Sequence, residues 1–351
     1  MAIDQPDSTR GMGRRVLVTI GALCLYCVGW QIPLAGVNSE ALGRALSATG
    51  PALPRLSIFM LGVLPIFSAM IVAEIAKLAF PGLGRWTGLN RTIQIVALTL
   101  AAFQALGIAN ALETINGLVD EPGWGFHAEI IATLVAATAL LGWLADRITR
   151  QGVGDGFWLL LIAPILTLLP RSGALVYEFA RQGLISSSVI WVVLGYCLLA
   201  SVLIVPLALT RWVPAGRSIG AANDESQANS ARFMDVWTPL LAQYVGVLLF
   251  VALDLAWGSS INMASFAVGA PLHLLITAAL IAGFAFLRAP RGGAASQPAV
   301  VAALAQIAIC CIGELLLRNL GLPFAIDGPW LIVVIATLTR VATTIAGRQA
   351  R

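Results

Sequence analysis

Long apolar runs alternate with short polar stretches along the whole chain. Ten such runs lie over residues 15–33, 56–79, 91–112, 128–146, 153–170, 187–210, 234–257, 270–288, 298–317 and 328–347. Each is close to the roughly 20 apolar residues that one helix needs to cross a bilayer. The pattern predicts an all-α polytopic membrane protein with ten transmembrane helices.

Composition excludes the main alternatives to a membrane protein. Of 351 residues, 59% are hydrophobic and only 11% are charged, whereas an average soluble domain has about 25% charged residues. So few charges cannot cover a water-facing surface, and so apolar a chain does not stay disordered. Both a soluble globular domain and a disordered chain are therefore ruled out.

The basic residues indicate the orientation of the helices. With a cytoplasmic N-terminus, 16 of the 21 lysines and arginines fall on the inner side, and five fall outside: Arg44, Arg55, Arg171, Arg181 and Arg318. This bias follows the positive-inside rule. It predicts a multi-pass protein of a bacterial-type inner (plasma) membrane, with cytoplasmic tails at residues 1–14 and 348–351. We expect no cleavable signal ahead of the first run, because no small-residue cleavage site follows its apolar stretch.

Residues 39–54 do not fit as a span, because they are too few and too polar to cross. Asn38 or Ser39 is a suitable N-cap for a short helix, and Gly50-Pro51 is a suitable end. The segment predicts either an interfacial or re-entrant helix on the outer side or an ordinary amphipathic surface helix.

A weak internal symmetry divides the ten runs into two groups of five, over residues 15–170 and 187–347, with an external hinge at 171–186. Pro65 and Pro239 lie in the second run of each group. An odd number of helices per group requires the two halves to be inverted relative to each other. Interrupted helices at matched positions of inverted repeats mark a pathway between the halves.

Residues for enzyme chemistry are scarce. Lys77 is the only lysine, the two histidines are far apart, and the five cysteines lack zinc-ligand spacing. We find no nucleophile–base pair or phosphate loop. We therefore expect no enzyme activity, no catalytic residues, no metal and no cofactor. The thinly spread basic charge is not typical of a nucleic-acid-binding protein.

Because acidic residues lie inside the spans, a transporter or ion channel for small solutes is an alternative function. They are Glu74, Asp235, Asp254 and Glu314, and such residues are functional candidates by default. Glu74 has Lys77 three residues on, and Glu314 has Arg318 four residues on. This spacing favours interfacial ion pairs.

Several segments, in order along the chain, resemble the SecY family. They cover residues 14–34, 55–71, 103–109, 146–156 and, less closely, 322–334. Two positions depart from the family pattern: Ala35 replaces a proline, and Asp155 replaces the usual asparagine. The resemblance implies a protein-conducting channel with an hourglass pore and a clamshell opening toward lipid.

The resemblance also implies roles for particular residues. Residues 39–54, with Leu42, Leu46 and Pro51, correspond to the plug that fills the outer funnel. The apolar ring at the pore waist corresponds to Val63, Phe67, Leu161, Leu241 and Val333.

The lateral gate of the family lies between the second and third helices on one side and the seventh and eighth on the other. Gln104 corresponds to a polar gate residue, and its usual asparagine partner aligns with Phe233. The gate then lacks an interhelical hydrogen bond, for which Asp235 and Gln243 are nearby substitutes.

Three loops on the cytoplasmic side are shorter than in the family, namely residues 81–91, 211–232 and 288–298. Shortened loops argue against docking of a ribosome or a SecA motor, and predict a compact, divergent SecY paralogue. By resemblance, its partners are secretory or membrane-protein substrates, the lipid bilayer, and SecE-like and SecG-like small subunits. A non-conducting assembly factor on the same scaffold is a further alternative.

Overall fold

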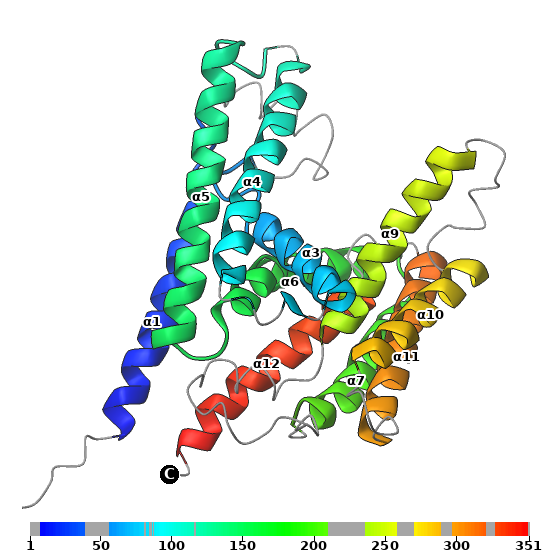
Figure 1. The fold of residues 1–351 in the computed structure, drawn as a ribbon. Coiled ribbons are helices and arrows are strands. Elements are labelled where there is room, and N and C mark those ends of the chain that lie inside the picture. Colours follow the sequence, from blue (N-terminus) through cyan, green and yellow to red (C-terminus); the bar gives the residue numbers. More distant parts are fainter. Residues whose placement is uncertain are drawn as a thin grey trace, which may run out of the picture. The chain divides into compact units, whose positions relative to one another are not determined.

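The computed structural model describes residues 8–38, 56–80, 82–83, 86, 88–115, 117–209, 236–257, 270–288, 297–320 and 327–349. These residues form ten α-helices (Figure 1). Their bounds are α1 Ser8–Gly29, α3 Leu64–Ala79, α4 Leu89–Glu113, α5 Trp124–Gln151, α6 Gly156–Arg181, α7 Ser187–Leu209, α9 Trp237–Trp257, α10 Pro271–Arg288, α11 Gln297–Leu320 and α12 Gly328–Gln349. The prediction of an all-α protein is confirmed.

Seven of the described helices are long and apolar enough to cross a membrane: α1, α4, α5, α6, α7, α11 and α12. The apolar stretches of α9 and α10 are shorter, and α3 has 16 residues. At a rise of about 1.5 Å per residue, α3 is about 24 Å long, less than the hydrocarbon thickness of about 30 Å.

The helix bounds differ most from expectation at α6. This helix continues to Arg181, so that residues 171–181 of the expected external hinge are helical. The predicted span ended at residue 170, which is a proline, but a membrane helix tolerates an internal proline. Beyond it, the chain is rich in good helix formers, and Arg181 pairs with Glu178 at 3.1 Å.

The chain divides into two compact units. The first comprises Met1–Pro164 and Thr344–Arg351, and the second comprises Ile165–Thr343. In the first unit α4 packs against α3 and α5, and α1 packs against α5. In the second, α10 packs against α9 and α11, and α11 packs against α7.

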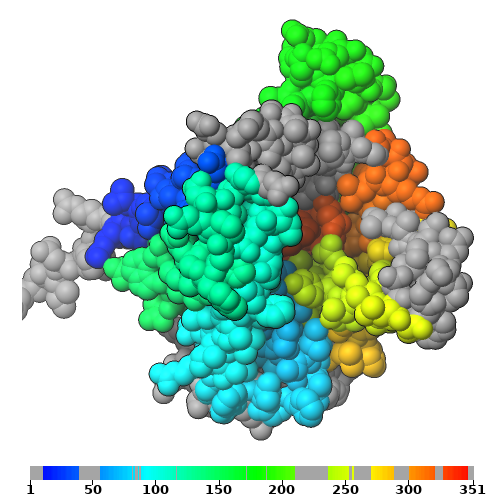
Figure 2. All heavy atoms as spheres, turned by 90° about the horizontal axis from the view of Figure 1, so that it is seen from above, coloured from blue at the N-terminus to red at the C-terminus, as the bar shows by residue number. Residues whose placement is uncertain are grey.

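Small side chains bring α4 and α5 together. Ala101, Ala105 and Ala109 recur every four residues on α4 and are fully buried, against Ile130 and Leu134 of α5. Such a row lets two helix backbones approach closely. Figure 2 shows the two helices side by side in the space-filling view, α4 in cyan and α5 in blue-green.

Candidate functional site

The second predicted span is a broken helix. Residues 56–63 form successive turns, with hydrogen bonds from Met60 N to Ser57 O (3.0 Å) and from Gly62 N to Phe59 O (2.8 Å). Gly62 has a φ of +55°, which a glycine adopts without strain. Helix α3 begins only at Leu64, with Pro65 in its first turn. Within the span predicted over 56–79, the helix itself therefore begins near Pro65, because proline fits the start of a helix better than its interior.

This break places two of the predicted ring residues in the first turn of α3. Val63 is the N-cap of the helix, and its carbonyl accepts a hydrogen bond from Phe67 N at 2.9 Å. Both side chains are at most 3% exposed. The Phe67 ring stacks on Phe157 of α6 with 6.5 Å between centroids. Leu161, one turn after Phe157, is also buried.

The second unit repeats this local arrangement. Pro239 is the third residue of α9, and Leu241 follows two residues later, as Phe67 follows Pro65. Leu241 and Val333 of α12 are fully buried. All five predicted ring residues are thus buried and apolar. That they form one ring stays a prediction.

The predicted plug residues Leu42, Leu46 and Pro51 lie outside the described part of the chain. The chain on either side of residues 39–55 is tied by backbone hydrogen bonds: Leu34 N to Leu56 O (3.0 Å), Ile58 N to Ile32 O (3.1 Å), Asn38 N to Leu118 O (2.8 Å) and Asp120 N to Gly36 O (3.2 Å). The Asn38 amide also donates to Asp120 at 3.1 Å. The segment therefore starts and ends on fixed backbone of the first unit.

Of the predicted gate residues, only Gln104 lies in the described part of the chain. Its Oε1 is buried on α4 without a hydrogen-bond partner among the described residues. Phe233 and Asp235 lie outside that part. Gln243, the other suggested substitute, donates its side-chain amide to Asp327 within the second unit.

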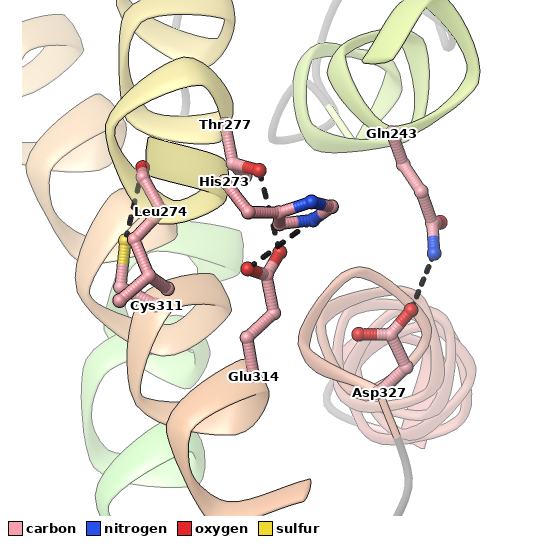
Figure 3. Close-up of polar contacts among 7 residues, drawn as sticks. All are labelled: Gln243, His273, Leu274, Thr277, Cys311, Glu314 and Asp327. Atoms are coloured by element: carbon pink, nitrogen blue, oxygen red, sulfur yellow. Dashed lines mark hydrogen bonds and ion pairs between the residues drawn. The ribbon is translucent and has the colours of Figure 1, made fainter. Parts of the chain in front are cut away.

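Two of the four intramembrane acids, Glu74 and Glu314, have partners in the described part of the chain, whereas Asp235 and the side chain of Asp254 lie outside it. Lys77 pairs with Glu74 at 2.7 Å, as the spacing predicted. Glu314 of α11 lies against a histidine of another helix, α10. The distance between His273 Nε2 and Glu314 Oε2 is 3.5 Å (Figure 3). The pairing of Glu314 with Arg318 stays a prediction.

Sequence reasoning missed the His273–Glu314 pair. It treated the two histidines as isolated because they are distant in sequence. One signal was available: His273 and Thr277 are four residues apart and so share one face of α10. The Thr277 hydroxyl donates to Glu314 Oε1 at 3.4 Å.

Asp327, directly before α12, has a perturbed carboxyl. Burial raises its pKa above the ordinary value, although the hydrogen bonds from Gln243 and from Gly328 N–H, and the nearby His273, act in the opposite direction. Desolvation of the charged form is the larger effect here. A neutral Asp327 is thus more favourable in the folded chain than in water.

Seven described helices of membrane-spanning length, together with α3 and α9, which have a proline in their first turn, define a multi-pass α-helical membrane protein. The family model named SecY matches residues 57–290, which is more than half of the chain. The chain belongs to the SecY family.

Similar curated proteins carry the name protein translocase subunit SecY. The one from Escherichia coli is 33% identical over 207 residues, covering 52% of this chain and 47% of its own length. The one from Buchnera aphidicola subsp. Acyrthosiphon kondoi is also 33% identical over 207 residues, and the match covers 52% of this chain and 58% of that protein's length. That from Rickettsia bellii is 28% identical over 317 residues, covering 80% of this chain and 73% of its own. The chain spans about half the length of the first two.

Solved structures show the same fold. A SecY channel described for its plug domain has a TM-score of 0.56 at 10% identity, with coverage of 100% of this chain and 95% of that one. Sec61 in a canine ribosome–channel complex has a TM-score of 0.56 at 12% identity and the same coverage. A structure described as a protein-conducting channel has a TM-score of 0.54.

Proposed function

We propose that this protein is a SecY-type channel that moves unfolded polypeptides across a membrane, or inserts them into it, through a central pore and a lateral gate. The observation that carries the proposal is a local feature that recurs in this SecY-family chain. Helices α3 and α9 each have a proline in their first turn, and each bears a buried apolar residue two positions after that proline.

An apolar waist suits the passage of a polypeptide. A narrow apolar collar excludes water and raises the barrier to ions. Val63, Phe67 and Leu161 in the first unit, with Leu241 and Val333 in the second, supply only carbon-rich side chains. Flexible apolar side chains fit around many substrate sequences, whereas a charged residue would stabilise ions inside the pore.

Two of the four acids that favoured a solute transporter have basic partners. Glu74 pairs with Lys77 on the same helix, and Glu314 lies beside His273. Among the described residues, no group of three or more histidine, cysteine or acidic side chains is arranged to hold a metal ion. These contacts support the translocation proposal over ion-driven uptake.

Orientation and partners belong to the same proposal. The charge bias supports cytoplasmic termini. SecE-like and SecG-like subunits are proposed partners because SecY proteins associate with such small membrane subunits.

Reduced cytoplasmic loops support a channel that does not rely on full docking of a ribosome or SecA. The lateral gate, with Gln104 on α4, supports release of apolar segments into lipid.

Photo-crosslinking tests the translocation proposal. A signal-bearing polypeptide is arrested during transport in proteoliposomes, with a photo-reactive side chain at Phe67, Leu161 or Leu241 in turn. We expect adducts with the arrested polypeptide from all three positions, because each lies at the proposed waist. We expect these adducts only when the polypeptide carries its signal sequence.

Matched controls come from the exposed faces of the same helices. Val72 of α3 and Val247 of α9 are 57% and 56% exposed, and a probe there is expected to label lipid or no protein. The absence of polypeptide adducts from Phe67, Leu161 and Leu241 alike, in membranes that retain the protein, would reject the proposal.

A further inference from the structure

A short sequence motif occurs twice in the chain, once in each unit. Residues 155–161 are DGFWLLL, and residues 327–333 are DGPWLIV. Helices α6 and α12 both begin at the glycine of the motif. The last residue of each motif is a predicted ring residue, Leu161 or Val333. Each of these therefore lies five residues, or about 7.5 Å of helix rise, after the glycine that begins its helix.

The aspartate of each motif has the same role at the helix start. Its backbone carbonyl accepts a hydrogen bond from the residue four positions later. The distance is 3.0 Å from Leu159 N to Asp155 O in α6 and 2.9 Å from Leu331 N to Asp327 O in α12. This is the pattern of an N-cap residue, so both helices begin in the same register.

The glycine of each motif lies against the backbone of the preceding helix. A Cβ at Gly156 would be 2.0 Å from Ala145 O of α5, and a Cβ at Gly328 would be 2.6 Å from Cys310 Cα of α11. Only a residue without a side chain fits at such distances. Helix α6 therefore begins in backbone contact with α5, and α12 begins in backbone contact with α11.

In the first unit, a hydroxyl of α1 holds the turn that leads into the motif. Helix α1 packs along α5 (Figure 1). The buried Thr19 hydroxyl donates to Arg15 O at 3.1 Å and accepts from Val153 N at 2.8 Å. A Cβ at Gly152 would be 2.5 Å from Thr19 Oγ1. The first helix of this unit is thus tied to the chain just ahead of Gly156.

In the second unit, a hydroxyl of α7 has the equivalent place. Tyr196 is buried, and its hydroxyl donates to Ile309 O of α11 at 2.9 Å. A Cβ at Gly313 would be 2.5 Å from that hydroxyl, and a Cβ at Gly328 would be 3.0 Å from the same Ile309 O. The carbonyl that accepts the tyrosine hydroxyl is therefore also the carbonyl against which α12 begins.

We propose that Thr19 and Tyr196 are equivalent positioning residues. Each acts from the first helix of its group of five on the start of a ring-bearing helix. Thr19 sets the position of Leu161 relative to α5, and Tyr196 sets that of Val333 relative to α11. That the two ring residues line a pore rests on the proposed function. The two contacts do not, since each lies within one unit.

Fluorine NMR tests the positioning without a transport assay. The full chain is labelled with 5-fluorotryptophan in lipid nanodiscs, and the reporters are the tryptophans of the two motifs. Their resonances are assigned with Trp158→Phe and Trp330→Phe. The test variants are Thr19→Val and Tyr196→Phe, which remove the hydroxyls and keep the shapes of the side chains.

Each variant is expected to affect the motif of its own unit. Loss of a buried hydrogen bond is unfavourable, so the start of the following helix is no longer held at one place. Thr19→Val should shift the Trp158 resonance by more than its line width and leave that of Trp330 unchanged. Tyr196→Phe should do the opposite. Thr19→Ser, which keeps a hydroxyl, should retain the parent spectrum.

Matched controls alter the same residue types away from the two motifs. Thr99 is exposed and donates to Ile95 O of its own helix, and Tyr177 is 70% exposed. Neither Thr99→Val nor Tyr177→Phe should shift the two reporter resonances. Hydrogen exchange of the parent protein needs no variant to fold: the Val153 amide should exchange as slowly as those of the flanking helices.

Ion leak from proteoliposomes measures the consequence for the pore. Thr19→Val and Tyr196→Phe should each raise the leak about fivefold, the factor that corresponds to about 1 kcal/mol, with the same amount of folded protein. The controls should not raise it. A leak at the parent level, in a protein that gives the crosslinks described above, would overturn the assignment of the two residues to the ring.

The positioning proposal is overturned if either test variant leaves the resonance of its own motif in place, or if the Val153 amide exchanges rapidly in the parent. It is also overturned if Thr19→Ser gives the spectrum of Thr19→Val. Shifted resonances combined with absent crosslinks would reject the translocation proposal and leave the positioning residues in place. Unshifted resonances combined with crosslinks would do the reverse.

Discussion

Asp327 shows how a single side chain can balance opposing effects. Its carboxylate accepts hydrogen bonds from Gln243 and Gly328, and His273 lies near, yet burial still raises its pKa above the ordinary value of 3.8. In the unfolded chain the same carboxyl is exposed to water. The folded protein therefore binds a proton more tightly at this position than the unfolded chain does.

The pH dependence of stability follows from this difference. Between 3.8 and the raised pKa of the folded state, the folded protein holds more protons than the unfolded chain, so stability falls as the pH rises. The contribution of Asp327 is fully present below 3.8 and is lost as the pH rises through the raised folded pKa.

Asp327→Asn is expected to remove this decrease. Asparagine keeps an oxygen that can accept from Gln243 but has no charge to bury. The midpoint of thermal unfolding in mild detergent, measured from about pH 4 to about pH 7, should fall less steeply in the variant. At the upper end, the variant should unfold at the same temperature as the parent or higher. A larger loss of stability at about pH 7 than at about pH 4 would show that the ionised carboxylate is stabilising.

At the scale of elements, the turn between α5 and α6 depends on backbone contact. A Cβ at Gly156 would lie 2.0 Å from the carbonyl oxygen of Ala145 and 2.8 Å from Ile148 Cβ. Gly156 N also donates to the Thr149 hydroxyl at 2.9 Å. Only a glycine allows α6 to begin so close to α5, and α6 carries Leu161.

Gly156→Ala is therefore expected to destabilise the protein by about 1–3 kcal/mol, the usual range for overpacking. Thermal unfolding in mild detergent measures the change. Gly107→Ala is the matched control, because Gly107 is a helical glycine of α4 with open space around it. There alanine should be neutral, or stabilising by up to about 1 kcal/mol through helix propensity. Equal effects of the two substitutions would contradict the close contact.

The prolines of α3 and α9 show what local sequence reveals about an element and what it leaves open. Both were found as interruptions of apolar runs, because proline lacks an N–H and disfavours a helix interior. The pattern did not reveal that α3 begins at Leu64, since residues 56–63 are as apolar as the helix itself. Turns with backbone pairing to residues 32 and 34 decide that boundary.

At the scale of the whole molecule, a resting channel must not leak ions. The segment 39–54 is proposed as the plug, and the described backbone on both sides of it is held by hydrogen bonds to residues 32–34 and 118. Shortening the segment leaves these bonds in place, so the first unit should still fold.

Deletion of residues 40–50 is therefore expected to raise the ion conductance of proteoliposomes by at least about tenfold, without loss of folded protein. Dye or ion efflux measures the leak. The matched control replaces residues 40–50 by a glycine–serine segment of equal length, which tests whether bulk alone maintains the seal. Unchanged tightness after deletion would favour a non-conducting assembly factor on the same scaffold.

The amino-acid sequence alone determined the class of this protein, its succession of apolar helices and the apolar character of the five ring positions. These are properties of single segments, since the bilayer thickness sets the length of an apolar run wherever it occurs. The ordered segments likewise indicated the SecY family.

Only the tertiary structure decided which polar groups of different helices meet. Gln243 and Asp327 are 84 residues apart, and Thr277 and Glu314 are 37 residues apart. Whether such groups touch depends on the rotation of each helix about its axis and on the crossing of its neighbours. These depend on the packing of many side chains at once, so no local pattern of hydrophobic and polar positions contains them.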